Sequence, residues 1–360
     1  MHKINGHHRP TVRFIDLFCG IGGFRFAIEA VARKTLTDSQ CVFSSDIDRD
    51  CQKAYAGNFG ETPHGDITQI AASEISDHDI LLAGFPCQPF SIIGQMKGFE
   101  DTRGTLFFDI ARILEAKRPK AFVLENVKLL AGHDGGKTLK KILKTLADLG
   151  YYTEYRVLNA LDFGLPQKRE RIWIVGFREG EYITWPQGGV PMMPLSKLLE
   201  RNVPPEFYAS ERIRNKRWNV LQPGKEPTIW HENKAGHISS YPYSCALRAG
   251  ASYNYLLVNG ERRLTPRELL RLQGFPESFK IVCSDSQTRK QAGNSLPVNV
   301  AEVLLKQVFA AFGFSTESRE GELSVAQLRL LEEASKYNER TKTKNGRKVS
   351  SSVSAKQAAK

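Results

Sequence analysis

Residues 14–24 read FIDLFCGIGGF, a short apolar run that passes through glycines directly into a helical pattern. Glycines in such a turn let the backbone approach a ligand, and the free N–H groups at the start of the helix favour an anionic group. A dinucleotide-binding loop would have Gly or Ala where this chain has Arg25, so nicotinamide and flavin cofactors are disfavoured. The glycine turn alone is equally consistent with an ordinary connection.

Around this stretch, short apolar runs alternate with amphipathic runs as far as residue 178. The expected strands are 12–18, 41–46, 79–84, 121–126 and 171–177, with another before Asp66, and the expected helices are 24–34, 106–117 and 138–149. Strands interleaved with helices predict an α/β fold, in which helices cover both faces of a mostly parallel sheet.

The alternation of strand and helix patterns ends after Phe177. Residues 179–261 contain Gly-rich and Pro-rich runs with few helical periods, which predicts a smaller, loop-rich domain. Helical patterns return at 265–272 and 296–312, and the second is expected to pack back onto the first domain. The predicted organisation is a domain of residues 12–178, an inserted domain 179–261, a return segment 262–314 and a basic, partly disordered extension 315–360.

The composition is that of a globular chain. It has 360 residues, 41% of them apolar, and a net charge of +12, of which +7 lies in residues 336–360 with eight Lys/Arg and one Glu. The basic excess allows a polyanionic partner without demonstrating one. No apolar run reaches the ~18 residues that span a bilayer and the first residues lack a secretory segment, so we expect a cytoplasmic protein without a membrane partner. The six cysteines form no CxxC pair, which predicts reduced thiols and no metal site.

Carboxylates follow two of the expected strands. Asp46, with Ile47 and Asp48 after it, lies about two dozen residues beyond the glycine loop, where a carboxylate can accept hydrogen bonds from ribose hydroxyls. Asp66, within HGDI, could accept from an exocyclic amine. These parts suit adenosine without phosphates, and the glycine loop would then hold an amino-acid carboxylate.

The run GFPCQPFS, residues 84–91, places Cys87 between two prolines at the end of a strand. That is a stiff turn at the edge where open α/β sheets bind ligands. Most cysteines are small core residues, but the turn-forming neighbours of Cys87 favour a nucleophile. Its thiol, with an ordinary pKa of ~8.5, needs an activating partner. Glu125 ends the next strand and is either an acid of the same site or a solvated strand-end residue.

With Cys87 and Glu125 beside the glycine loop, the chain resembles the cytosine carbon-5 DNA methyltransferases of the bacterial restriction-modification type. The resemblance rests on an ordered series of motifs across residues 12–178 and 262–312: FIDLFCGIGGF, HGDI, GFPCQPFS with GFEDTRGTLFFDIARIL, ENV, NALDFGLPQKRERIWIVGF, RRLTPRELLRLQGFPESFK and QAGNSLPVNV. It implies a Rossmann-like, S-adenosylmethionine-dependent methyltransferase, a target-recognition domain in residues 179–261, and a monomer that acts on double-stranded DNA.

The resemblance also implies residue roles. The residues around S-adenosylmethionine would be Phe18, Gly20, Gly22, Gly23, Asp46, Ile47, Asp66, Ile67, Pro86 and Asn294, with Asp46 at the ribose and Asp66 at the adenine amine. The catalytic residues would be Cys87 as nucleophile, Glu125 and Arg171 around the target base, and Arg169 as an orienter of the catalytic loop.

Two positions depart from the family pattern. Asp46 stands where members commonly have Glu, so the ribose contact is one methylene shorter. Ala246-Leu247 stands where a Thr-Leu pair is usual, so the hydroxyl contact expected there is absent.

These residues suit methylation of carbon 5 of a cytosine that has been flipped out of the duplex. Addition of a thiolate to carbon 6 makes carbon 5 nucleophilic, and a protonated Glu125 would stabilise the charge at nitrogen 3, which requires a pKa raised by burial. Arg171 would donate to the oxygen on carbon 2. The base that removes the carbon-5 hydrogen is not identified by the sequence.

Contacts to DNA are expected from three places: a moving loop at residues 88–104, the basic run 212–218 at the DNA backbone, and Arg248 at a guanine. An RNA cytosine-5 methyltransferase and a non-catalytic DNA-binding relative are the alternatives. The long recognition segment argues against the first, and the intact nucleophile, acid and glycine loop argue against the second.

Overall fold

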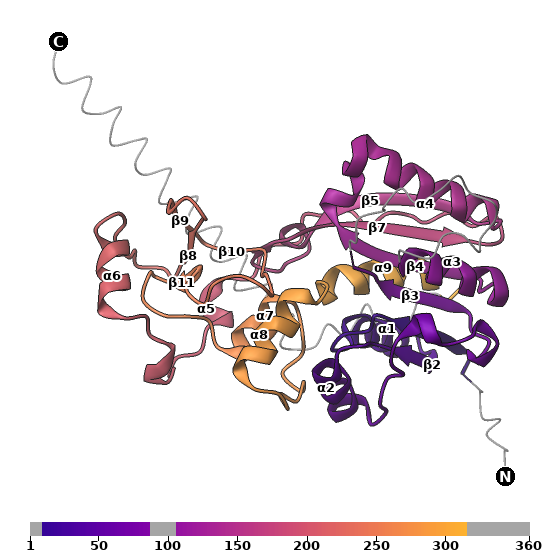
Figure 1. Ribbon diagram of the computed structural model, residues 1–360, viewed down its shortest axis with the longest axis horizontal. Helices are drawn as coiled ribbons and strands as arrows, with labels where there is room; N and C mark the ends of the chain where they lie inside the picture. The colour runs from indigo at the N-terminus through magenta and orange to yellow at the C-terminus, as the bar shows by residue number, and fades with distance from the viewer. Residues whose placement is uncertain (1–8, 87–105, 315–360) are drawn as a thin grey trace, which may run out of the picture. The chain divides into compact units, whose positions relative to one another are not determined.

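The computed structural model describes residues 9–86 and 106–314, so Cys87, the predicted moving loop 88–104 and the extension 315–360 lie outside the described residues. By its contacts the chain forms one unit, Met1–Phe314, and a second, Ser315–Lys360. The centre of the first unit is a six-stranded sheet in the order β2–β1–β3–β4–β7–β5 (Figure 1).

The sheet is mostly parallel, as predicted. Its strands are β1 (Thr11–Leu17), β2 (Asp38–Ser45), β3 (Ile80–Gly84), β4 (Ala121–Val127), β5 (Tyr152–Asn159) and β7 (Glu170–Phe177). The pairs β1–β2, β1–β3 and β3–β4 are parallel, whereas β7 runs antiparallel between β4 and β5. The connection from β5 to β7 contains no crossover helix, and a parallel pairing of consecutive strands requires one.

Helices cover both faces of the sheet (Figure 1). Those on one face are α1 (Gly23–Lys34), α2 (Arg49–Phe59) and α9 (Val298–Ala311), and those on the other are α3 (Leu106–Lys117) and α4 (Lys137–Asp148). Alternation along β1 divides its side chains between them, because Phe14 packs in the cluster of α1 and α9 while Ile15 and Leu17 pack in the cluster of α3 and α4. The chain therefore returns through α9 to the domain in which it began.

Two details of the sheet differ from the sequence-based expectation. The strand expected before Asp66 is absent, since α2 fills most of that interval and only His64 pairs with Ser45 in an isolated bridge. Strand β5 was not expected. It is an edge strand whose exposed face carries Tyr155 and Val157, so it lacks the apolar run that marks the buried strands.

Short elements make up the region after β7. They are α5 (Leu195–Leu198), α6 (Glu211–Trp218), the antiparallel strands β8 (Ile229–Glu232), β9 (Ile238–Tyr241) and β11 (Leu256–Val258), and β10 (Ser244–Cys245), which pairs with β6 (Gln167–Lys168). Two further helices follow, α7 (Pro266–Leu272) and α8 (Asp285–Asn294).

The apolar clusters cross the expected domain boundaries. Leu269 of α7 and Ala292 of α8 pack in the cluster of β8 and β11, although they belong to the expected return segment. Ile183 and Trp185 pack in the cluster of α1, although they belong to the expected inserted domain. The division at residues 178/179 and 261/262 stays a prediction.

One part of the basic run 212–218 has a structural role. Arg217 is fully buried, donates to the Trp230 carbonyl (3.3 Å) and to Glu232 (3.1 Å), and also bonds to the Asn254 carbonyl. A buried guanidinium cannot contact a phosphate, so the prediction was wrong for Arg217. Within the described ranges, no helix is long and apolar enough to cross a membrane.

Candidate functional site

A cavity of about 850 Å³ opens where β1, β2, β3 and β4 end. Its wall contains the predicted residues Phe18, Gly20, Gly23, Asp46, Ile47, Asp66, Ile67, Pro86, Glu125, Arg169, Arg171 and Asn294. Gly22 is not part of the wall, and Cys87 lies outside the described residues although its neighbour Pro86 belongs to the wall. Residues separated by up to 276 positions, from Phe18 to Asn294, thus meet at one edge of the sheet.

The glycine loop adopts a backbone that glycine favours. Phe18, Gly20 and Gly22 have positive φ angles of 54°, 55° and 84°. A side chain at Gly22 would also collide with the Phe59 ring of α2, since a Cβ there would lie 2.3 Å from it. Gly22 therefore serves the packing of the loop on α2, while Gly20 and Gly23 face the cavity.

Asp46 fixes this loop against the end of β2. One carboxylate oxygen accepts from the Gly20 N–H (2.8 Å) and the other from the Asp48 N–H (2.8 Å). Each oxygen keeps a second lone pair that can accept a ribose hydroxyl. Burial raises the pKa of Asp46, and the two backbone hydrogen bonds oppose that shift. The side chain of Ile47 beside it is 72% exposed in the cavity wall and offers an apolar surface to a flat ring.

A buried acid lies beneath the loop. Asp16 is on the α1 side of β1, and its Oδ2 has no hydrogen-bond partner among the described residues. The nearby Arg25 donates to Glu61 (2.8 Å) and to the Tyr55 hydroxyl (3.3 Å), and it also pairs with Glu29. Burial raises the pKa of Asp16 to about 8, against the attraction of Arg25, so this carboxyl carries a proton at neutral pH.

Replacing Asp16 by Asn is expected to flatten the pH dependence of stability. Because the folded-state pKa is raised from 3.8 to about 8, the contribution of Asp16 is complete below pH 3.8 and is lost as the pH rises towards 8. Between pH 5 and pH 7.5, the free energy of unfolding of wild type should therefore fall by roughly 3 kcal/mol more than that of Asp16→Asn. Urea denaturation at both pH values measures it, with the exposed Asp148→Asn as control. Equal pH slopes for wild type and Asp16→Asn would contradict the assignment.

Glu125 and Arg171 line the same cavity from β4 and β7, which are separated from the strand of the glycine loop, β1, by β3. Arg171 Nε lies 2.8 Å from Glu125 Oε1, and Arg171 Nη1 also donates to the Glu170 carbonyl (2.8 Å). Glu125 pairs in register with Gly84 of β3, the residue three positions before Cys87 in the sequence. Burial raises the pKa of Glu125, although Arg171 and Arg169 pull it down. A carboxyl poised in this way can hold a proton beside a substrate.

Arg169 has a different role from Arg171. It is 1% exposed and donates to the carbonyls of Leu247 (3.0 Å), Gly293 (3.1 Å) and Ser295 (2.5 Å). Burial lowers the pKa of Arg169 to about 9, so the guanidinium is still charged at neutral pH. Arg169 therefore joins the β6–β7 region to Leu247, between β10 and β11, and to the C-terminal end of α8, as a positioning residue.

Asn126 is a residue of the site to which the sequence patterns assigned no role. Its side chain is buried, its Nδ2 donates to the Phe85 carbonyl (2.9 Å), and its Oδ1 accepts from the Val127 N–H (2.8 Å). It thereby fixes the end of β3 two residues before Cys87. The motif ENV contains it, but an amide at a strand end carries no signal for this contact.

Asn126→Ala is expected to lower kcat about 10- to 100-fold, because the turn before the nucleophile loses its tie to β4 and small displacements of reacting groups are costly. The affinity for S-adenosylmethionine should change less than about threefold, since the hydrogen bonds of Asn126 go to Phe85 and Val127, whereas Asp46 bonds to Gly20 and Asp48. Steady-state rates and cofactor titration separate the two. Asn58→Ala loses a comparable bond to the Lys280 carbonyl (3.1 Å) outside the cavity and serves as control. A kcat within twofold of wild type would count against the contact.

The described residues contain no group of three or more His, Cys, Asp or Glu side chains that could hold a metal ion.

Comparison with known proteins identifies the family. The family model described as C-5 cytosine-specific DNA methylase matches residues 12–235 and 198–310. The type II methyltransferase M.NgoBI from Neisseria gonorrhoeae is 56% identical over 295 residues, which cover 81% of this chain and 91% of that protein. M.HaeII from Haemophilus aegyptius is 52% identical over 305 residues, 84% of this chain and 94% of that protein.

Solved structures show the same fold. The S. pombe Dnmt2 methyltransferase superposes with a TM-score of 0.63 at 21% identity, across 84% of this chain and 99% of that one. At 21% identity this likeness shows the fold alone. The reaction is shown by the family model and by the similarity to M.NgoBI and M.HaeII. The chain therefore belongs to the C-5 cytosine-specific DNA methylases and is an enzyme that methylates carbon 5 of cytosine in DNA.

Proposed function

We propose that this enzyme methylates a cytosine flipped out of duplex DNA, using Cys87 as nucleophile and S-adenosylmethionine as methyl donor. The observation that carries the proposal is that one cavity joins the glycine loop and Asp46 to the Glu125–Arg171 pair. A methyl donor and an acceptor base have to meet in one enclosed space, and this cavity supplies both surfaces.

The cofactor half of the cavity fits S-adenosylmethionine. Asp46 would accept from the ribose, Asp66 would accept from the adenine amine, and Ile47 would offer an apolar surface to the adenine ring. Phe18, Gly20, Gly23, Ile67, Pro86 and Asn294 complete the wall. The side chain of Asp66 is already oriented, because it accepts from the Thr68 N–H (3.0 Å) and hydroxyl (2.9 Å). When bound, the cofactor supplies an electrophilic methyl group.

The base half of the cavity fits cytosine. The Cys87 thiolate forms a bond to carbon 6, the electron pair of the 5,6 double bond becomes available at carbon 5, and protonated Glu125 donates towards nitrogen 3. Arg171 donates towards the oxygen on carbon 2. After methyl transfer, loss of the carbon-5 proton restores the double bond and expels the thiolate.

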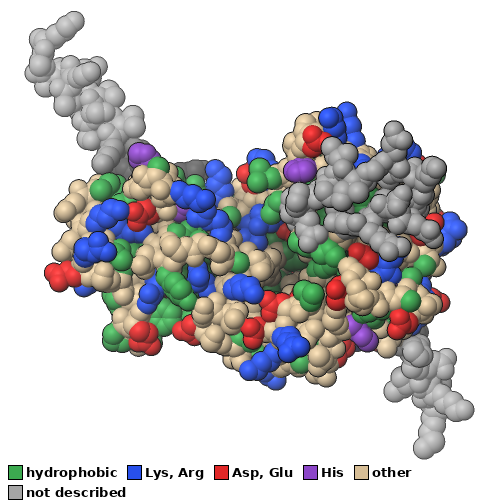
Figure 2. Space-filling view, in the orientation of Figure 1, with side chains coloured by type: hydrophobic (Ala, Val, Ile, Leu, Met, Phe, Trp, Pro, Cys, Tyr) green, Lys and Arg blue, Asp and Glu red, His purple; other side chains and the backbone are tan. Residues whose placement is uncertain are grey.

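The DNA partner is supported by the relatives and by the charge of the chain. M.NgoBI and M.HaeII are type II methyltransferases, so we place this enzyme in a restriction-modification system, with residues 179–261 as its recognition domain and a monomer as the acting unit. Lys and Arg side chains are interspersed with Asp and Glu on the face in Figure 2, which favours discrete phosphate contacts over one basic surface.

Transfer of labelled methyl groups tests the proposal. The enzyme is incubated with labelled S-adenosylmethionine and either duplex DNA or tRNA, and we expect label in DNA at carbon 5 of cytosine. Label that enters only tRNA would overturn the choice of substrate. Bisulfite sequencing of DNA from cells that express the chain would then locate the methylated sites.

A further inference from the structure

Helix α8 contacts two functional parts of the molecule. On its cofactor side, Lys290 bonds to Asp48 (2.7 Å) and Gln291 donates to the Asp50 carbonyl (3.0 Å), both at the start of α2. On its other side it packs against the segment of residues 246–255, which joins β10 to β11. We call this stretch the β10–β11 segment.

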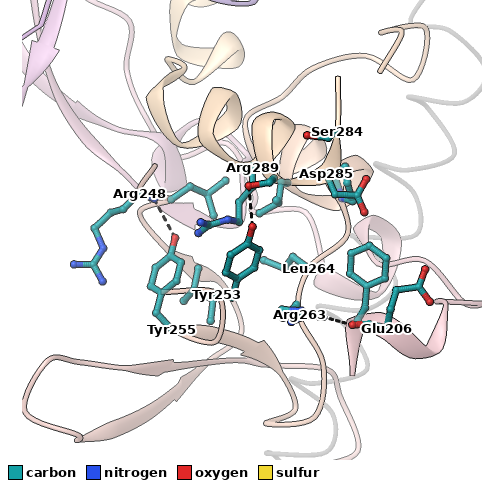
Figure 3. A pocket seen from close by; sticks show the side chains of 15 residues that line it. Glu206, Arg248, Tyr253, Tyr255, Arg263, Leu264, Ser284, Asp285 and Arg289 are labelled. Carbon is teal, nitrogen blue, oxygen red and sulfur yellow. Dashed lines mark hydrogen bonds between the residues drawn. The ribbon is translucent and has the colours of Figure 1, made fainter. Parts of the chain in front are cut away.

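The first half of α8 holds the β10–β11 segment through Tyr253. The Arg289 guanidinium lies 4.3 Å from the centre of the Tyr253 ring and donates to the Ala251 carbonyl (2.9 Å). The Tyr253 hydroxyl donates to Ser286 Oγ (2.8 Å), and Figure 3 shows Tyr253 beside Arg289 in the wall of a second pocket, of about 340 Å³. Tyr253 is 49% exposed, so these contacts hold it rather than burial.

The second half of α8 fixes the same segment by close packing. A Cβ added at Gly293 would lie 2.4 Å from the Ala249 nitrogen and 2.8 Å from the Arg248 carbonyl carbon, so the backbones are in direct contact. Arg248, Ala249 and Gly250 in turn line the large cavity. The Arg248 N–H donates to the Tyr255 hydroxyl (3.0 Å; Figure 3), and the Arg248 guanidinium lies 4.9 Å from the centre of the Tyr255 ring.

We propose that Tyr253 and Arg289 are positioning residues that hold Arg248–Gly250 at the wall of the cavity where the target cytosine enters, and that they set the KM for DNA. The inference rests on the proposed function, which places the base in that cavity. The cofactor half is held separately, by Asp46 on the glycine loop and by Lys290 on α2. Loosening Tyr253 should therefore weaken the use of DNA and leave cofactor binding unchanged.

Four variants test the inference: Tyr253→Ala, Arg289→Ala, Tyr253→Phe and the double alanine variant. Each single alanine variant should raise the KM for DNA about tenfold, with kcat and the Kd for S-adenosylmethionine within about twofold of wild type. The double variant should be no worse than the poorer single one, because both lose the same contact. Tyr253→Phe retains the ring under Arg289 and should recover most of the affinity for DNA.

Lys290→Ala is the matched control, on the same helix but on the opposite side. It should weaken cofactor binding and leave the KM for DNA near the wild-type value. The inference fails if the KM for DNA is unchanged in both alanine variants, if their effects multiply in the double variant, or if cofactor affinity falls in parallel. Should the alanine variants not fold, an unchanged KM for DNA in Arg289→Lys, which loses the planar stack, would refute it equally. If wild-type enzyme methylates tRNA and not DNA, the proposed function fails instead.

Discussion

Cys87→Ser is expected to reduce methyl transfer by roughly four orders of magnitude or more. A hydroxyl ionises far less readily than a thiol and is a poorer nucleophile towards carbon 6, so carbon 5 is not activated. The two described residues that precede Cys87 belong to the site, since Pro86 lines the cavity and the Phe85 carbonyl accepts from Asn126 (2.9 Å). Initial rates with labelled S-adenosylmethionine, with cofactor and DNA binding measured in parallel, check the result.

The covalent step has a direct readout. In DNA that contains 5-fluorocytosine, the substituent at carbon 5 cannot leave as a proton, so the adduct between enzyme and base should persist and shift the protein in a denaturing gel. The shift should be present in wild type and absent in Cys87→Ser. Cys283→Ala is the matched control, because its sulfur contacts the Asp50 carbonyl (3.4 Å) outside the cavity wall. Retained activity in Cys87→Ser would overturn the assignment of the nucleophile.

The parts of the site that could be predicted are those that the chain places at strand ends. Asp46, Pro86 and Glu125 each follow or end an apolar run, and parallel strands deliver such positions to one edge. The strands β1, β3 and β4 can be predicted from their apolar runs, because both faces of these strands are buried. Local pattern and global position agree there, which makes the prediction possible.

The parts that could not be predicted depend on contacts between distant residues. Arg217 belongs to a run that is typical of a DNA-contacting surface, yet it is buried because Glu232 and two carbonyls surround it. Asn126 and Arg169 act through bonds to backbone carbonyls, and any residue type can supply a carbonyl. No spacing rule in the sequence marks such a partner, so only the folded chain shows which polar residues are structural.

Glu125→Gln is expected to lower kcat about 10²- to 10⁴-fold, the range found for loss of a general acid. The amide has nearly the same shape and can remain beside Arg171, but its N–H group can only donate a hydrogen bond to nitrogen 3 and cannot transfer a proton to it. In wild type, ionisation of Glu125 should lower kcat as the pH rises above the raised pKa of this group, because the ionised carboxylate cannot donate. In Glu125→Gln this decline should be absent. Rates at saturating substrates across roughly pH 5.5–9 check it.

The stability of the same variant separates loss of the acid from structural damage. The pKa of Glu125 is raised on folding from 4.5, so its contribution to stability is complete below that value and is lost as the pH rises through the folded-state pKa. Glu125→Gln should therefore gain stability relative to wild type as the pH increases, while its activity stays low. Glu154→Gln, whose carboxylate accepts from Trp185 Nε1 (3.0 Å) outside the cavity, should retain both wild-type kcat and its pH profile. If Glu125→Gln were instead less stable than wild type at high pH, structural damage would explain its low activity. The carboxylate would then serve the fold through Arg171 rather than the chemistry.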